Sequence, residues 1–323
     1  MKNLIKNKIA SNIFVLLLGI ATSFSLPPYN FFLINFVTLS LFYIFINNYK
    51  KNLKNKFNYF KYGWIFGFGY FISSLYWIAI SLTFDESFKI LIPISLILVP
   101  AFIGIFYGLA TYFFSFFINK FNTIGSVLIF SVIFGTFEFI RGFILTGFPW
   151  NLFVYSFSKN LDFIQILSFI GTYSLNLLCL TLFLLPALFI LRNSRNELYF
   201  CLFFISLVIG LKIFGQNTLK SSDKFINTIE NLNIKIISSR VKIDRFYNQN
   251  NEYEILNDLI ILSDPDKEKS TLFIWPEGIV TSTNLNEVKK FKDLFNSNFS
   301  EKHLIIFGIN DLNNKNNPEI YNT

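Results

Sequence analysis

Seven long apolar segments follow one another along the first two thirds of the chain, and they restrict the possible folds more than any other feature. They lie at about residues 9–26, 31–47, 63–83, 90–117, 124–145, 163–191 and 199–214. A helix that crosses a bilayer needs roughly 20 mainly apolar residues. The sequence therefore predicts an all-α membrane bundle of about seven transmembrane helices over residues 1–214.

Composition and charge agree with a membrane class. Hydrophobic residues make up 53% of the 323 residues and charged residues 15%, which lies outside the usual range of soluble globular proteins. Residues 1–214 hold 15 Lys and Arg against 5 Asp and Glu, whereas residues 215–323 hold 13 against 15. A basic excess confined to the membrane part is typical of cytoplasmic loops. The remaining segment has no basic patch, so we expect no binding of nucleic acid.

The basic residues also predict the orientation of the bundle. Five lysines lie between residues 50 and 61, Lys120 follows the fourth segment, and Arg192 and Arg195 follow the sixth. Short loops rich in Lys and Arg stay in the cytoplasm, so seven spans from a cytoplasmic start place the rest of the chain outside. We expect a multi-pass protein of the bacterial inner membrane with a periplasmic soluble part. The first segment is interpreted as a span, because no clear site for signal-peptide cleavage follows it.

The pattern changes after about residue 215. Short β-like runs at Asn233–Ser238, Thr271–Trp275 and His303–Ile309 alternate with stretches of helical spacing at Glu252–Ser263 and Leu285–Phe295. This order predicts an α/β organisation with a covered sheet. Because the segment is short for such a domain, we expect residues 215–323 to form only its N-terminal part.

Cysteine and histidine exclude several kinds of site. Cys179 and Cys201 both lie in apolar segments, and the single histidine, His303, begins an apolar run. A Ser-His-Asp triad or a multi-histidine metal site needs partners that this chain does not have. We therefore expect neither a metal nor another cofactor.

Two charged residues lie inside the fifth apolar segment, and an exit from the membrane follows them. Glu138 and Arg141 are three residues apart and so share one face of a helix. Ionisable residues at membrane depth are costly and often functional, but a structural ion pair that holds the bundle together is the more common role of such a pair. Trp150, in the exit that follows, could simply be an aromatic residue of the membrane interface.

A carboxylate follows the second β-like run directly. The run Leu272–Trp275 stops at Pro276, which lacks the N–H needed to continue a strand ladder, and Glu277 comes next. Open α/β sheets often place catalytic groups at such strand ends. The alternative is that Glu277 is merely an exposed loop residue, as most acidic residues are.

An ordered set of motifs carries a resemblance to a known family. It comprises Gly67-Phe68-Gly69, Tyr76-Trp77, Glu138, Arg141-Gly142, Thr146-Gly147-Phe148-Pro149-Trp150-Asn151, Gln165, Gly171, Trp275-Pro276-Glu277 and Tyr321-Asn322. In this order, over nearly the whole chain, the set resembles the bacterial apolipoprotein N-acyltransferase family. The Thr-Gly-Phe-Pro-Trp-Asn run together with the Trp-Pro-Glu strand is much more specific than any single motif.

The resemblance implies an integral membrane enzyme whose soluble part is a nitrilase-like α-β-β-α sandwich. Such enzymes use a Glu-Lys-Cys triad, in which the cysteine takes an acyl chain from a phospholipid donor as a thioester. They pass it to the α-amine of the diacylglyceryl-cysteine of an apolipoprotein acceptor. By position, Glu277 matches the general base, and Trp150, Asn151 and Asn322 match candidate substrate-binding residues.

The chain departs from the family pattern in one large respect. The lysine and the nucleophilic cysteine of the family follow the Tyr-Asn motif, and here the sequence stops at that motif. Cys179 and Cys201 lie in apolar segments far along the chain from Glu277 and cannot replace that cysteine. We therefore expect an inactive, C-terminally truncated piece. Smaller departures are Ser238-Ser239-Arg240, where the family usually has Gln-x-Asn, and Phe246, where a tryptophan is common.

Two other functions fit parts of the sequence. One is a different membrane-tethered carbon–nitrogen hydrolase that uses the same triad on a soluble amide. The other is a non-catalytic, transporter-like protein in which Glu138 and Arg141 form part of a pathway. An anchor needs only one or two spans, so a bundle of seven favours an enzyme that takes a substrate from the bilayer.

Overall fold

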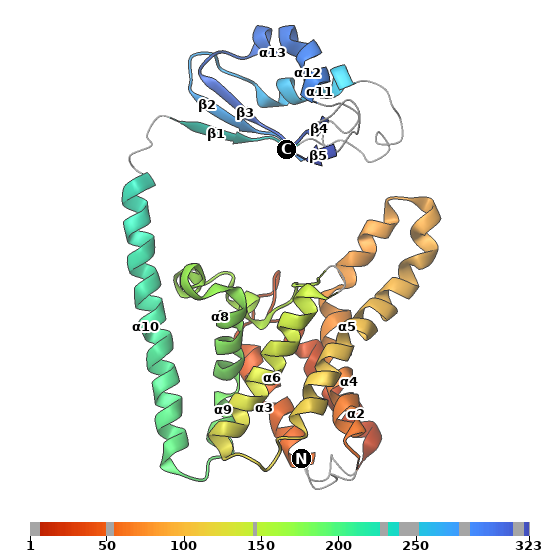
Figure 1. Ribbon diagram of the computed structural model, residues 1–323, viewed down its shortest axis with the longest axis vertical. Coiled ribbons are helices and arrows are strands. Elements are labelled where there is room, and N and C mark those ends of the chain that lie inside the picture. The colour runs from red at the N-terminus through yellow and green to blue at the C-terminus, as the bar shows by residue number, and fades with distance from the viewer. Residues whose placement is uncertain are drawn as a thin grey trace. The chain divides into compact units, whose positions relative to one another are not determined.

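The computed structural model describes residues 7–49, 55–144, 147–226, 232–238, 252–277, 285–312 and 320–322. The chain divides into two compact units, Met1–Ser221 and Ser222–Thr323 (Figure 1). The predicted boundary near residue 215 lies inside helix α10, which continues to Ile226.

The described part of the first unit consists of helices joined by turns and short irregular segments. Its elements are α2 (Lys8–Ser23), α3 (Leu33–Asn48), α4 (Phe57–Ser74), η2 (Tyr76–Thr83), η3 (Glu86–Leu91), α5 (Ile92–Phe114), α6 (Thr123–Phe143), η4 (Phe153–Phe157), α7 (Leu161–Ile164), α8 (Leu167–Phe183), α9 (Leu185–Ile190) and α10 (Arg195–Ile226). Each predicted apolar segment coincides with one or more of these helices.

Four stretches of described helix are long and apolar enough to cross a membrane. They are Glu86–Phe114, Thr123–Phe143, Leu167–Ile190 and Arg195–Ser221. The pair α4 and η2 makes a fifth if it counts as one span, although the two helices meet at 47°. Helices α2 and α3 are apolar but have only 16 residues each. The membrane character is thus confirmed, and the count of seven spans stays a prediction.

Polar side chains fix where several of these helices begin. The Asn122 side chain accepts a hydrogen bond of 2.8 Å from the backbone N–H of Gly125 at the start of α6. At the start of α10, Glu197 accepts from the backbone N–H of Ser194 at 2.9 Å. Both residues are at positions where oxygen-bearing side chains satisfy the free N–H groups of a first turn.

Close backbone contacts hold α2, α4 and α5 together. A Cβ atom added to Gly19 on α2 would lie 2.1 Å from the carbonyl oxygen of Phe66 on α4, and one added to Gly67 would lie 3.0 Å from Cα of Gly104 on α5. In a membrane, lipid tails are as apolar as side chains, so helices associate through close packing at small residues. The aromatic rings fill the space around these contacts, as in the stack of Phe42 on Phe66 with ring centroids 4.2 Å apart.

Gly19→Val should therefore destabilise the bundle, because backbone atoms of α4 occupy the space that the new side chain needs. Overpacking of this kind costs about 1–3 kcal/mol, occasionally more, and we expect the upper end of that range. The matched control is Gly210→Val in α10, where an added Cβ meets no described atom within 4 Å. Unfolding of both variants in detergent should show a loss for the first alone, and equal stabilities would contradict the packing argument.

The second unit contains a parallel sheet in the order β1-β2-β3. Its elements are β1 (Asn233–Ile236), α11 (Glu252–Ser263), β2 (Thr271–Ile274), α12 (Leu285–Val288), η6 (Lys289–Phe291), α13 (Lys292–Asn298), β3 (His303–Ile306), β4 (Asn310–Leu312) and β5 (Ile320–Asn322), of which the last two pair antiparallel. The sequence predicted β1 to β3 and α11 at these places. The predicted helical stretch 285–295 is divided among α12, η6 and α13.

Helices cover one face of this sheet (Figure 1). Phe273 and Trp275 point into a core with Leu256, Leu259 and Ile260 of α11. The indole Nε1–H of Trp275 donates a hydrogen bond of 2.9 Å to Ser263 Oγ at the end of α11. Burial of the aromatic strand residues and this bond together hold α11 on the sheet.

The opposite face of the sheet carries two rows of aliphatic side chains. The register aligns Ile234, Leu272 and Leu304 in one row, and Ile236, Ile274 and Ile306 in the next. On the outer strands these side chains are exposed, Ile236 to 77%. Parallel sheets normally have both faces buried, whereas the described part of the chain leaves these side chains on the outer strands exposed.

Candidate functional site

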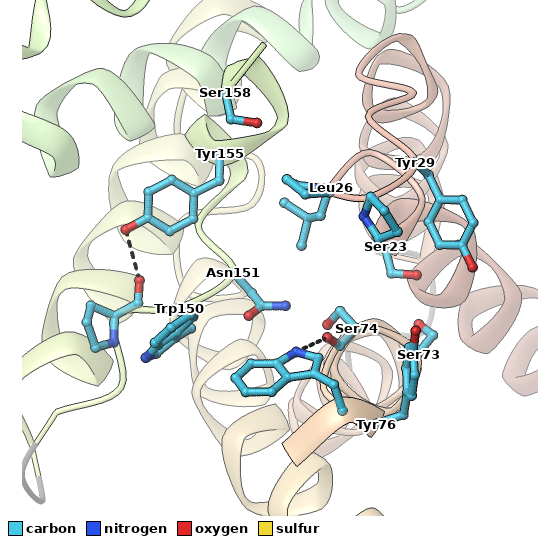
Figure 2. A pocket seen from close by; sticks show the side chains of 14 residues that line it. Ser23, Leu26, Tyr29, Ser73, Ser74, Tyr76, Trp150, Asn151, Tyr155 and Ser158 are labelled. Atoms are coloured by element: carbon cyan, nitrogen blue, oxygen red, sulfur yellow. Dashed lines mark hydrogen bonds between the residues drawn. The ribbon is translucent and has the colours of Figure 1, made fainter. Parts of the chain in front are cut away.

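A cavity of about 640 Å³ opens at one end of the helical unit (Figure 2). Three parts of the chain form it: the end of α2 with the turn after it, the end of α4 with the start of η2, and the segment that follows α6. The lining residues are Ser23, Leu26, Pro27, Pro28, Tyr29, Ser73, Ser74, Tyr76, Trp77, Pro149, Trp150, Asn151, Tyr155 and Ser158. We call this cavity the pocket.

The direction of the helices places the pocket away from the basic residues at the helix starts. Helices α2, α4 and α6 begin at Lys8, Phe57 and Thr123, close in sequence to the basic residues, and all three end at the pocket side. The described basic residues beside these helix starts, Lys8, Lys56 and Lys120, therefore lie at the other end of these helices.

The walls of the pocket are mainly apolar and aromatic. The rings of Trp77 and Trp150 lie 5.5 Å apart and bring two segments together that are far apart in the sequence. The hydroxyls of Ser73 and Ser74 each donate 2.7 Å hydrogen bonds to carbonyls of α4, so these serines present little polarity to the cavity. A pocket of this size with few convergent polar groups suits an apolar ligand.

Asn151 is the main polar side chain directed into the pocket. Figure 2 shows its amide between the rings of the 149–158 segment and the serines at the end of α4. Its backbone has φ of +59°, a left-handed conformation that asparagine adopts more readily than most residues. Its own carbonyl oxygen accepts a 2.9 Å hydrogen bond from the Tyr70 hydroxyl.

The predicted pair Glu138 and Arg141 lies directly behind the segment that carries Trp150 and Asn151, which forms one wall of the pocket. Both side chains are buried, and Arg141 Nη2 lies 3.9 Å from Glu138 Oε1. Glu138 also accepts hydrogen bonds from the Tyr107 hydroxyl, at 2.9 Å, and from the Asn176 amide. Nη1 of Arg141 donates to the carbonyl oxygens of Phe148 and Trp150, each at 2.8 Å. The pair is thus connected to the pocket wall without lining the pocket itself.

An apolar arm adjoins the pocket. It comprises η2, η3 and the first turns of α5, and in Figure 1 it extends beyond the ends of the neighbouring helices. Trp77, Ile80, Phe84 and Phe88 on this arm are exposed. Its tip is polar: hydrogen bonds from the Ser87 hydroxyl and N–H hold the pKa of Asp85 below its usual range.

The remaining predicted site residues belong to the second unit. Glu277 is exposed and follows Trp275-Pro276 at the carboxyl end of β2, as the strand-end argument predicted. Asn322 lies in β5, in register with Asn310 of β4. Thr146 of the family motif and the departures at Ser239, Arg240 and Phe246 lie outside the described residues. The structure thus brings Trp150 and Asn151 together in one pocket and describes Glu277 and Asn322 in the other unit.

The sequence did not predict several residues of the site. Tyr107 and Asn176 bind Glu138, and Tyr155 closes one side of the pocket through a 3.2 Å hydrogen bond to the carbonyl of Pro149. Asn176 carried a usable signal, because an amide inside an apolar segment is costly without a partner. No such signal marks Tyr155, since tyrosine is common at membrane interfaces.

Known proteins are similar in sequence to this part of the chain. The profile of the family described as "Apolipoprotein N-acyltransferase N-terminal domain" matches residues 18–185, a range that includes every pocket residue and the Glu138–Arg141 pair. The chain is 30% identical to an apolipoprotein N-acyltransferase of Rhodopseudomonas palustris over 226 residues, which cover 67% of this chain and 41% of that protein. A Brucella melitensis relative of the same name is 28% identical over 68% of this chain and 42% of its own length.

A third relative matches further into the second unit. The apolipoprotein N-acyltransferase of Rickettsia prowazekii is 29% identical over 307 residues, covering 93% of this chain and 58% of that protein. The chain spans about two fifths of the length of the first two relatives. The profile match over more than half of the chain shows that the chain belongs to the apolipoprotein N-acyltransferase family.

Proposed function

We propose that this chain forms the lipid-binding part, and the first section of the catalytic part, of an apolipoprotein N-acyltransferase. The enzyme transfers an acyl chain from a phospholipid to the α-amine of the diacylglyceryl-cysteine of an apolipoprotein. The observation that carries the proposal is the apolar pocket within the family-matched region, lined by Trp150 and Asn151. In this proposal the pocket binds an acyl chain of the phospholipid.

The location of the pocket supports a substrate that comes from the bilayer. The pocket lies at the end of α2, α4 and α6 opposite the described basic residues Lys8, Lys56 and Lys120, and the distribution of positive charge favours a cytoplasmic side there. The exposed apolar side chains of the adjoining arm are suited to contact with lipid tails. We therefore propose an inner-membrane protein with the pocket at the outer leaflet and the second unit in the periplasm.

The chemistry requires a base, which we propose is Glu277. Its carboxylate would accept the proton of a cysteine thiol, and the thiolate would attack the phospholipid ester to form a thioester. The proton would pass from Glu277 to the leaving alkoxide, which departs as the lysophospholipid. Glu277 would then accept the proton of the attacking α-amine and deliver it to the departing thiolate, so that collapse of the intermediate forms the amide and returns the thiol. We propose that the cysteine and lysine of the triad come from polypeptide outside these 323 residues.

The second unit fits a larger domain of this kind. Its sheet has helices on one face and two rows of aliphatic side chains exposed on the other. A second sheet packed on that face would bury it and produce the four-layer sandwich expected for a nitrilase-like domain. This open face is the support for the fold that the family resemblance implies.

The transporter-like alternative receives no support from the site. Glu138 and Arg141 are buried against tyrosine, asparagine and backbone groups rather than along a cavity. The hydrolase of a soluble amide is also disfavoured, because the pocket presents mainly apolar surface beside an apolar arm.

A direct test of the pocket uses phosphatidylethanolamine with a nitroxide on its acyl chain. It should quench the fluorescence of Trp77 and Trp150, measured as the difference from the W77F/W150F variant. Ser74→Phe should abolish most of this quenching, because the ring would fill the cavity. The control Ser206→Phe adds the same ring on an exposed face of α10. Equal quenching in both variants would exclude the pocket as the lipid site.

A test of the activity needs the polypeptide extended by the downstream genomic reading frame. Acyl transfer from phosphatidylethanolamine to a diacylated lipopeptide should occur in the extended form and not in the 323-residue chain. Activity in the short form would contradict the proposed triad, and an extension without an in-frame lysine and cysteine would contradict the proposed enzyme.

A further inference from the structure

The segment from Phe148 to Val154 forms one wall of the pocket, and side chains of three helices bind its backbone. Residues 147–152 belong to no helix or strand. Arg141 binds the carbonyls of Phe148 and Trp150, Tyr70 binds the carbonyl of Asn151, and Asn176 Oδ1 accepts from the N–H of Val154 at 3.0 Å. Irregular backbone at membrane depth requires such partners, since lipid offers none.

Arg141 makes two of these four contacts through a single nitrogen. Its Nη1 lies between the two carbonyl oxygens that flank Pro149, so the guanidinium fixes the backbone on both sides of that residue. The N–H of Phe148 also donates to the carbonyl of Arg141 at 2.9 Å. The direction in which the Trp150 side chain points therefore depends on the position of the guanidinium.

Buried groups hold the guanidinium in turn. Glu138 lies 3.9 Å from Nη2, too far for a hydrogen bond but near enough for strong attraction in a buried site. The Phe71 ring lies 5.2 Å from Cζ, a cation–π distance. Glu138 is itself fixed by Tyr107 and Asn176. This chain of contacts connects α4, α5, α6 and α8 to a single pocket wall.

We propose that Arg141 is a positioning residue that holds Trp150 and Asn151 in the pocket wall and thereby sets the affinity of the pocket for an acyl chain. The identity of the ligand rests on the proposed function, whereas the positioning rests on the contacts above. Lysine is a poor substitute, because its single nitrogen can lie either at the two carbonyls, where Nη1 lies, or beside Glu138, where Nη2 lies, whereas the planar guanidinium reaches both.

The test uses the full chain labelled with 5-fluorotryptophan. The four tryptophans, Trp64, Trp77, Trp150 and Trp275, give four ¹⁹F resonances, which single Trp→Phe variants assign. Arg141→Lys should move the Trp150 resonance and leave Trp64 and Trp275 unchanged. Tyr70→Phe, which removes one uncharged contact to the same segment, should move it less. Tyr43→Phe, which removes a buried 2.8 Å hydrogen bond to Ser126 elsewhere in the bundle, should not move it.

Lipid binding is measured on the same samples. Phosphatidylethanolamine with a nitroxide on its acyl chain should broaden the Trp150 resonance, and Arg141→Lys should weaken this binding by about tenfold, the ratio that corresponds to one lost charge-assisted hydrogen bond. An unmoved Trp150 resonance in both Arg141→Lys and Tyr70→Phe overturns the positioning role. A moved resonance with no broadening by lipid in the unmodified chain supports the positioning and excludes the acyl-chain pocket, so the two failures are distinguishable. A folded Tyr70→Phe variant keeps the test decisive if Arg141→Lys does not fold.

Discussion

Glu277→Gln should lower acyl transfer by at least about 100-fold in the extended polypeptide, since a positioned general base contributes roughly 10²–10⁴-fold to such reactions. Glutamine has nearly the same shape but cannot accept the proton of a thiol or an ammonium group. Glu277 follows the buried residue Trp275 and Pro276 at the end of β2, so the substitution changes an exposed position and should leave the sheet intact. The expected result is thus a folded protein with little activity.

The measurement separates the two chemical steps. Mass spectrometry after incubation with phosphatidylethanolamine reports the acyl-enzyme, and addition of a diacylated lipopeptide reports its turnover. A base that serves both steps predicts that Glu277→Gln forms almost no acyl-enzyme. The control is Glu268→Gln, which removes an exposed carboxylate 3.3 Å from Lys302 in the same unit and should keep full activity. If Glu277→Gln retained more than about a tenth of the activity, Glu277 would not be the base.

Local patterns in the sequence predicted the second unit well. The run at 271–275 alternates between the two faces of β2, with Phe273 and Trp275 buried, and the apolar spacing of Glu252–Ser263 matches α11 at both ends. These features depend on periodicities of two and 3.6 residues, which are properties of neighbouring residues. The open face of the sheet could not be predicted, because what covers a strand is decided by distant parts of a chain.

The membrane bundle was harder to predict in detail. Hydropathy marks where a helix is apolar but does not register its bends. The bend of 47° between α4 and η2, and the break in α8 at Gly171 with φ of +74°, divide segments that the sequence presents as continuous. A φ in this region favours glycine, so Gly171 offered a signal for the second break. Nothing comparable marks the first.

The pocket combines a predictable part with an unpredictable one. Tyr76-Trp77 and Trp150-Asn151 were both identified as motifs, but no local rule indicated that the Trp77 and Trp150 rings would meet. That contact depends on the packing of α4 against α2 and α5 through their glycines. Likewise, the i, i+3 spacing predicted that Glu138 and Arg141 would be neighbours, whereas the contacts of Arg141 with the pocket wall required the tertiary structure.

Glu138→Gln should destabilise the helical unit by about 3–5 kcal/mol, because it leaves the buried guanidinium of Arg141 without a counter-charge. Glutamine keeps only one acceptor oxygen, whereas Tyr107 and Asn176 donate to the two different carboxylate oxygens of Glu138 in the native protein. Unfolding in mixed detergent micelles measures the loss. Tyr43→Phe is the matched control, because a single buried hydrogen bond in a membrane bundle contributes about 1 kcal/mol or less.

The double variant Glu138→Gln with Arg141→Met decides whether charge is the cause. Each single substitution leaves one buried charge without its partner, whereas the double variant leaves none. The loss of stability in the double variant should therefore be smaller than the sum of the losses in the two single variants. The double variant should still be less stable than the native protein, because the carbonyls of Phe148 and Trp150 lose their donor and stay buried. A cost for Glu138→Gln no larger than for Tyr43→Phe would show that the pair is not electrostatically coupled. Strict additivity of the two single costs would show the same, and the pocket wall would then depend on the carbonyl contacts of Arg141 alone.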